Sequence, residues 1–126
     1  MNNKSIDWAV DVFVNFNYGN VIKKKVNDMV YQNGDCIVWN FHGNTIAKAN
    51  TTDNTIMVTL NGWAAKSTME RLNALLQALG VKGHPFRGYG TTRHSSKPTF
   101  CGTPISDTEE IVIKLEDIPT GAYNYE

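Results

Sequence analysis

The chain has 126 residues, with 12 Lys and Arg against 12 Asp and Glu, and 41% hydrophobic residues. This length favours a single domain, residues 1–126, with a core of its own, and the composition excludes a disordered chain. No apolar run approaches the roughly 20 residues of a membrane helix, Asp7 and Asp11 interrupt any signal-peptide core, and two cysteines are too few for a disulfide framework, so we expect a cytoplasmic protein without a membrane partner.

Two predictions are open for residues 6–18, IDWAVDVFVNFNY. Apolar residues alternate through this segment, which is the pattern of a β-strand. Ser5 is a suitable helix N-cap, however, and apolar residues also recur there at helical spacing. The pattern alone favours a strand, whereas the family resemblance described below favours a helix, and we adopt the helix.

A meander of short antiparallel strands is predicted in the next part of the chain, because turn signals separate short apolar runs. The turns are expected at NGD, residues 33–35, and at HGN, residues 42–44. The run KKK at 23–25 is typical of a solvated face or an edge strand. The expected strands are CIVWNF at 36–41, TIAKA at 45–49 and TIMVTL at 55–60.

The most distinct element is a helix over residues 67–79. Ser67 and Glu70 have the spacing of a capping box, in which each side chain bonds the other residue's backbone amide. Gly80 follows where a left-handed C-cap is expected. Arg71 and Asn73 form either a working surface or structural support. The apolar stripe consists of Met69, Leu72, Leu75, Leu76 and Leu79.

The C-terminal third combines a glycine- and proline-rich segment with one further strand. Residues 82–104 predict a long loop, or two weak strands around residues 88–90. EIVIKLEDI at 110–118 is the last expected strand. The predicted fold class is therefore α+β: a twisted antiparallel sheet of short strands with one main helix, about 67–79, packed on one face.

Catalytic and metal-binding motifs do not stand out. The possible ligands Cys36, His42, His84, His94 and Cys101 lack the spacing of a zinc site, and the glycines after the helix lack the lysine of a phosphate-binding loop. We expect no cofactor, no metal and no catalytic residue. The enzyme alternative is a small hydrolase or nuclease built around His84, His94 and Cys101.

A basic and aromatic segment, residues 82–97, is the sharpest candidate for binding. Its cations could meet phosphates and its rings could stack on bases. The zero net charge, however, offers little long-range attraction to nucleic acid. With the polar face of the helix, this segment supplies the candidate binding residues: Arg71, Asn73, Lys82, His84, Phe86, Arg87, Tyr89, Arg93, His94 and Lys97.

Charge is unevenly distributed along the chain. Residues 54–106 hold six Lys and Arg against one acid, whereas residues 107–126 hold six acids against one Lys. Such asymmetry can indicate an anionic partner. The interpretation we favour is that the acidic C-terminal strand folds back and neutralises the basic segment within the domain.

Part of the sequence resembles a loose group of small uncharacterised proteins of tailed bacteriophages. In that group G-N-x-I-A is followed by G-W and then by a helix beginning [ST]-T-x-x-R-[LI]-N. The matching residues here are 43–47, 62–63 and 67–73. The group often has a Thr after the Trp, where this chain has Ala64-Ala65.

Structural roles account for most of these recurring residues. Trp63 is expected to close the core over the start of the helix, and Thr68 to help cap it. Arg71 is expected to tie the helix to the carbonyls of the preceding turn.

The resemblance implies a phage origin and no particular activity. We therefore expect a non-enzymatic accessory protein, of inhibitor or adaptor type, that acts in the cytoplasm of an infected bacterial host on a host or phage macromolecule. A protein partner is favoured. Nucleic-acid binding through residues 82–97 is the first alternative, and a homodimer is also open.

Overall fold

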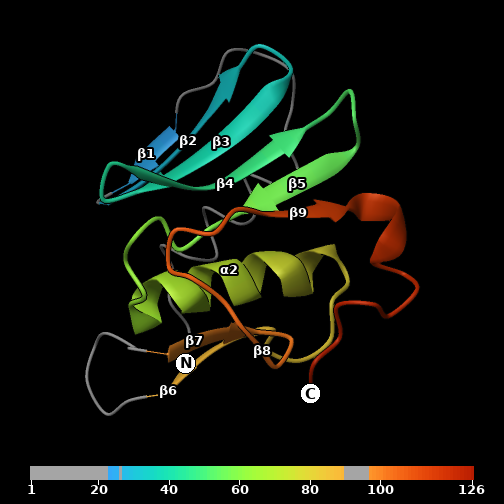
Figure 1. Cartoon of the computed structure of the whole chain (residues 1–126). Coiled ribbons are helices and arrows are strands. Elements are labelled where there is room, and N and C mark those ends of the chain that lie inside the picture. Colours follow the sequence, from blue (N-terminus) through green and yellow to red (C-terminus); the bar gives the residue numbers. More distant parts are fainter. Residues whose placement is uncertain (1–22, 26, 90–96) are drawn as a thin grey trace.

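Two antiparallel sheets and one α-helix make up the structure, a computed structural model that describes residues 23–25, 27–89 and 97–126 (Figure 1). This arrangement agrees with the α+β class predicted from the sequence. Residues 6–18, for which helix and strand were both open, lie outside the described residues.

The larger sheet has six strands in the order β1-β2-β3-β4-β5-β9, and every neighbouring pair is antiparallel. The KKK run forms β1, at one edge of the described sheet, which is one of the two positions expected for it. The predicted turns at 33–35 and 42–44 join β2 to β3 and β3 to β4. The strands are β1 (Lys23–Lys25), β2 (Asp28–Asn33), β3 (Cys36–Phe41), β4 (Asn44–Asn50), β5 (Thr55–Val58) and β9 (Ile111–Lys114).

Helix α2 (Lys66–Leu79) is present, but the predicted capping box is wrong. The helix begins with Ala65 as its N-cap and has no side-chain cap hydrogen bond. Ser67 therefore already lies inside the first turn, where its side chain is past the capping position. Glu70 instead lies 3.9 Å from the ammonium of the first helical residue. The predicted left-handed cap at Gly80 is confirmed, with φ of +116°.

A second sheet occupies the segment for which the sequence predicted either a long loop or two weak strands around residues 88–90, so the strand alternative is the closer one. Strands β6 (Phe86–Tyr89), β7 (Lys97–Phe100) and β8 (Thr103–Pro104) pair antiparallel in that order. Their local signal is weak because they are short and contain Gly and Pro. The last predicted strand is also shorter than expected, since β9 gives way to a 3₁₀ helix, η1 (Leu115–Asp117).

The core gathers around helix α2, which lies between the two sheets in Figure 1. Leu72, Leu75 and Leu76 of the helix are fully buried in one cluster with Trp39 of β3 and Phe86 of β6. Burial alternates along much of β2, β5 and β9, as expected for strands with one covered face, whereas Ile37, Val38 and Trp39 of β3 are all buried. On β9, Ile113 belongs to the core whereas the preceding residue, Val112, points the other way and is 63% exposed.

Candidate functional site

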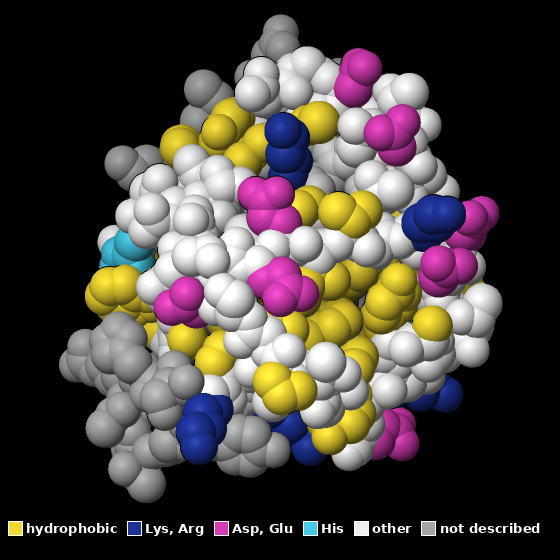
Figure 2. Space-filling model, in the orientation of Figure 1, with side chains coloured by type: hydrophobic (Ala, Val, Ile, Leu, Met, Phe, Trp, Pro, Cys, Tyr) yellow, Lys and Arg dark blue, Asp and Glu magenta, His cyan; other side chains and the backbone are white. Residues whose placement is uncertain are grey.

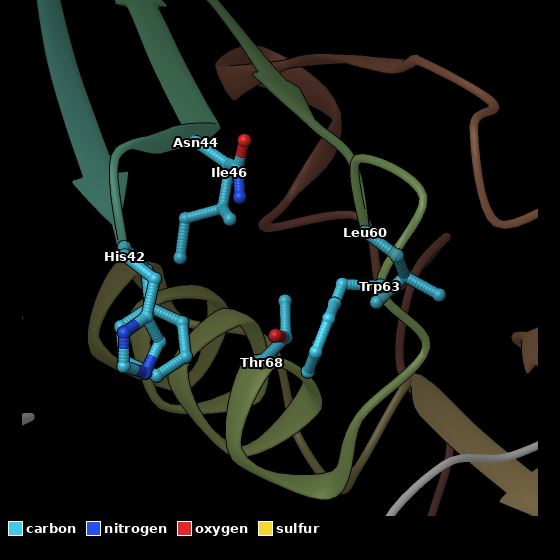
Figure 3. Close-up of a pocket in the computed structure, with 7 residues that line it drawn as sticks. His42, Asn44, Ile46, Leu60, Trp63 and Thr68 are labelled. Atoms are coloured by element: carbon cyan, nitrogen blue, oxygen red, sulfur yellow. The ribbon is translucent and has the colours of Figure 1, made fainter.

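A pocket of about 430 Å³ opens where the β3–β4 turn, the segment after β5 and the first turn of α2 meet (Figure 3). Its walls are mainly apolar and aromatic, with a few groups that can form hydrogen bonds. Pockets of this size and composition are typical ligand or side-chain sites. The lining residues are Phe41, His42, Asn44, Ile46, Leu60, Trp63 and Thr68.

Two tight turns set the walls of this pocket. His42-Gly43 connects β3 to β4 with φ of +52° and +79°, and Asn61-Gly62 has φ of +52° and +78°. Consecutive left-handed residues are the feature of type I′ turns, and Gly adopts them without a Cβ clash. The Asn61 side chain also donates to the Thr45 carbonyl at 2.9 Å. This bond ties the second turn to β4, so the two walls are held together.

Trp63 lies at the rim of the pocket and is 51% exposed. The sequence predicted instead that this side chain would close the core over the helix start, and that prediction is wrong. The core beside the helix start is filled by Leu60, Ala64 and Met69. The indole is therefore placed on the surface, next to the opening of an apolar pocket.

Thr68 contributes a hydroxyl to the helical side of the pocket, where Figure 3 shows it beside Trp63. The residue is 1% exposed, and its backbone amide donates to the Ala65 carbonyl. Among the described residues its hydroxyl has no hydrogen-bond partner. The helix has no side-chain cap, so the prediction that Thr68 helps to cap it is wrong.

Arg71 is buried and tied to β2 rather than to the turn carbonyls. Its Nε and Nη2 donate to the two carboxylate oxygens of Asp28, both at 2.9 Å, and Nη1 donates to the Ser67 carbonyl at 3.1 Å. The Trp39 indole N–H also donates to Asp28, at 2.9 Å. The guanidinium stacks 3.7 Å from the ring centroid of Phe41, a pocket residue. Arg71 therefore supports the pocket wall from behind.

Asn73 is buried and holds the second sheet to the helix. Its amide nitrogen donates to the Phe86 carbonyl at 2.9 Å, and its oxygen accepts from the Phe86 amide at 2.8 Å. The same helix reaches this segment again through Gln77, which donates to the Gly83 carbonyl at 2.6 Å. Partner binding by Arg71 and Asn73 stays a prediction, while the contacts on view give both residues a structural role.

The first half of the basic segment is occupied by the C-terminal residues. Arg87 donates to the backbone carbonyls of Tyr125 and Glu126, both at 3.1 Å, and its guanidinium lies 4.4 Å from the Tyr125 ring centroid. The Lys82 carbonyl accepts from the Tyr125 amide, and the His84 amide donates to the Tyr125 carbonyl. The tail thus does fold back onto this segment, and within the described residues these contacts are made by main-chain oxygens and the Tyr125 ring rather than by Asp or Glu side chains.

The other predicted binding residues are dispersed or not described. The side chain of Phe86 is in the core, whereas Lys82, His84 and Lys97 are exposed. Arg93, His94 and the side chain of Tyr89 lie outside what the structure describes. Figure 2 shows acidic and basic side chains interspersed on one face, with hydrophobic side chains exposed between them. The described side chains on that face therefore do not form one continuous basic surface.

Cys101 belongs to the enzyme alternative, and its environment disfavours a nucleophile. Burial raises the pKa of its thiol, which lies 3.4 Å from the Tyr123 carbonyl. A reactive cysteine needs a lowered pKa, because the thiolate is the nucleophile. No three His, Cys, Asp or Glu side chains gather into a possible metal site within the described ranges.

The Cys101 environment predicts slow alkylation. In a Cys36→Ser variant, the pH midpoint of iodoacetamide labelling should lie above the roughly 8.5 of a free cysteine, because less thiolate is present at any given pH. Unfolding in urea should return the midpoint to that value, which is the internal control. A folded-state midpoint below 8.5 would restore the nucleophile alternative.

The fold and pocket define a small α+β protein with an aromatic-rimmed pocket. The family described as Kyanoviridae Gp96 protein matches residues 9–95, so the chain belongs to this bacteriophage protein family. The match agrees with the phage origin inferred from the resemblance and does not test the residue pattern behind it. No curated protein and no solved structure matches the chain. No helix in the described part is long and apolar enough to cross a membrane.

Proposed function

We propose that the chain is a non-enzymatic phage accessory protein that binds another protein, and that the pocket beside Trp63 is its contact surface. The observation that carries this proposal is a half-exposed Trp63 at the rim of an apolar pocket of about 430 Å³. Tryptophan is enriched among the residues that dominate binding energy, particularly where it adjoins a pocket. The cytoplasm of an infected bacterial host is the proposed place of action.

The contacts of the Arg87 guanidinium favour a protein partner over nucleic acid. The nucleic-acid alternative needs the cations of residues 82–97 to meet phosphates. The guanidinium of Arg87 is engaged by two carbonyls and by the Tyr125 ring instead. Oligonucleotide binding by fluorescence anisotropy in ~50 mM salt, where phosphate contacts are strongest, measures this alternative directly.

Removal of the Trp63 indole tests the proposal. The wild type, Trp63→Ala and Val112→Ala are immobilised, and proteins retained from infected-host lysate are compared. Val112 is the matched control, since it is also a large exposed apolar residue but lies on the face of the sheet away from the core. We expect a partner retained by the wild type and by Val112→Ala, and weakened about 30-fold or more by Trp63→Ala, the loss of one dominant side chain.

Folding must be matched before these variants are compared. Circular dichroism and thermal unfolding should show that Trp63→Ala retains the native fold, because the side chain is not part of the buried cluster. Equal retention of the same partner by Trp63→Ala and the wild type would contradict the proposal. Tight oligonucleotide binding with no retained protein would favour the nucleic-acid alternative, and light scattering would show whether the partner is a second copy.

A further inference from the structure

The pocket combines apolar and aromatic walls with the hydroxyl of the buried Thr68, and this combination favours one kind of ligand. We propose that the pocket takes a tyrosine side chain of the partner protein, with its ring against the aromatic walls and its hydroxyl at Thr68. The inference rests on the proposed function, since it names the group that enters the same pocket.

The Thr68 hydroxyl is the deep polar group. Among the described residues, every side-chain nitrogen or oxygen that is closed off from solvent has a hydrogen-bond partner. The Thr68 hydroxyl has no hydrogen-bond partner in that part of the chain, and Thr68 lines the pocket, although the residue as a whole is only 1% exposed. A hydroxyl both donates and accepts, and leaving it unpaired beneath an apolar ligand is unfavourable. The fitting ligand therefore brings one polar atom to this depth.

The walls around that hydroxyl suit a flat apolar ring. Phe41, Ile46 and Leu60 are buried side chains that supply the apolar surface. The rings of Trp63 and His42 stand on opposite sides of the opening in Figure 3. Aromatic rings favour offset or edge-to-face contacts with one another. A phenol combines this apolar ring with a single polar atom at its tip.

Charged and multiply polar ligands fit this site poorly. Among the residues that the structure describes, no Lys or Arg lines the pocket. The nearby guanidinium of Arg71 lies against Phe41 and is held by both carboxylate oxygens of Asp28. A phosphate on a nucleotide or phosphotyrosine would therefore lack a counter-charge. A nucleobase would also bury several polar edge atoms where the hydroxyl of Thr68 is the deep partner.

Single-residue amides test the inference without knowledge of the partner. The protein is titrated with N-acetyl amides of tyrosine, phenylalanine, leucine and phosphotyrosine, and ¹H–¹⁵N chemical shifts are followed. We expect the tyrosine amide to bind with a dissociation constant on the order of 1 mM, typical of so small a ligand. It should bind about three- to tenfold more tightly than the phenylalanine amide, the effect of one added hydrogen bond. Shifts should centre on the pocket residues, and leucine and phosphotyrosine should bind more weakly.

Two Thr68 variants isolate the hydroxyl. Thr68→Val keeps the shape and should equalise tyrosine and phenylalanine, mainly by raising the affinity for the phenylalanine amide, whose ring then no longer covers an unpaired hydroxyl. Thr68→Ser keeps the hydroxyl and should retain the preference for tyrosine. Equal binding of the two amides by the wild type, a preference that survives Thr68→Val, or no binding of the tyrosine amide overturns the inference.

The two proposals fail in different ways. If the retained partner depends on Trp63 but the tyrosine and phenylalanine amides bind equally, the proposed function stands and the tyrosine ligand is contradicted. If the pocket prefers the tyrosine amide but Trp63→Ala retains the partner as well as the wild type does, the proposal that the pocket contacts the partner protein is contradicted.

Discussion

Replacing Asp28 by Ala is expected to lower the free energy of unfolding by about 3–5 kcal/mol, because it leaves the buried guanidinium of Arg71 without its counter-charge. The change also removes the acceptor of the Trp39 indole N–H. Chemical denaturation followed by far-UV circular dichroism measures this loss. Since Arg71 supports Phe41, the same variant should also weaken ligand binding in the pocket.

A double-mutant cycle distinguishes the ion pair from general disruption at this position. Asp28→Leu, Arg71→Met and the double variant are compared with the wild type. The double variant should be more stable than the sum of the two single losses predicts, because it leaves no buried charge unpaired. Additive losses would mean that the two side chains do not stabilise each other, contrary to the bidentate geometry.

Replacing Asn73 by Ala is the second costly change, with an expected loss of about 2–4 kcal/mol. Both backbone groups of Phe86 lose their partner, and each buried group left unpaired costs about 1–3 kcal/mol. Gln77→Ala is the matched control on the same helix. It also removes a bond to this segment, but at an exposed position, so its cost should stay below about 1 kcal/mol.

Hydrogen exchange locates the damage caused by Asn73→Ala. Protection should fall mainly in β6 and β7, which the Asn73 amide holds against the helix, and should remain in β3 and β4. A loss no larger than that of Gln77→Ala, or uniform deprotection of the larger sheet, would contradict this role for Asn73.

Local signals predicted the parts of the fold that depend on local physics. The two-residue turn at His42-Gly43 needs left-handed backbone, and Gly marks it in the sequence. The end of the helix at Gly80 is marked in the same way. The capping box failed because Ser67 and Glu70 have the right spacing but lie two residues too late, since the N-cap is Ala65. Spacing alone does not fix the register of a helix start.

Long-range partners could not be predicted in this way. Asp28 and Arg71 are 43 positions apart, and no pattern in the sequence pairs a carboxylate at the start of one strand with a guanidinium on a distant helix. The sequence therefore left open whether the polar face of the helix was a surface or a support. The second sheet was predicted only as an alternative to a loop for a related reason, since β6 is held by the side chain of Asn73 and not by strong strand propensity.

The pocket was present in the sequence only as separate residues. Asn44, Ile46, Trp63 and Thr68 belong to the pattern behind the phage resemblance, and Trp63 and Thr68 were interpreted as structural. Two left-handed turns bring them together, and the exposure of Trp63 is a tertiary property that the motif does not contain. The feature of the sequence that could have predicted an exposed Trp63 at the rim was the Gly-Trp pair in the short connection between a strand and a helix.

Site-specific photo-crosslinking in infected cells tests the central claim, that the Trp63 pocket contacts a partner protein. The photoreactive residue p-benzoylphenylalanine replaces Trp63 in one variant and the exposed Val112 in another. The account predicts a discrete protein adduct from position 63 that is absent from position 112, and competition of that adduct by excess wild-type protein. No adduct at position 63, or the same adducts from both positions, would contradict it.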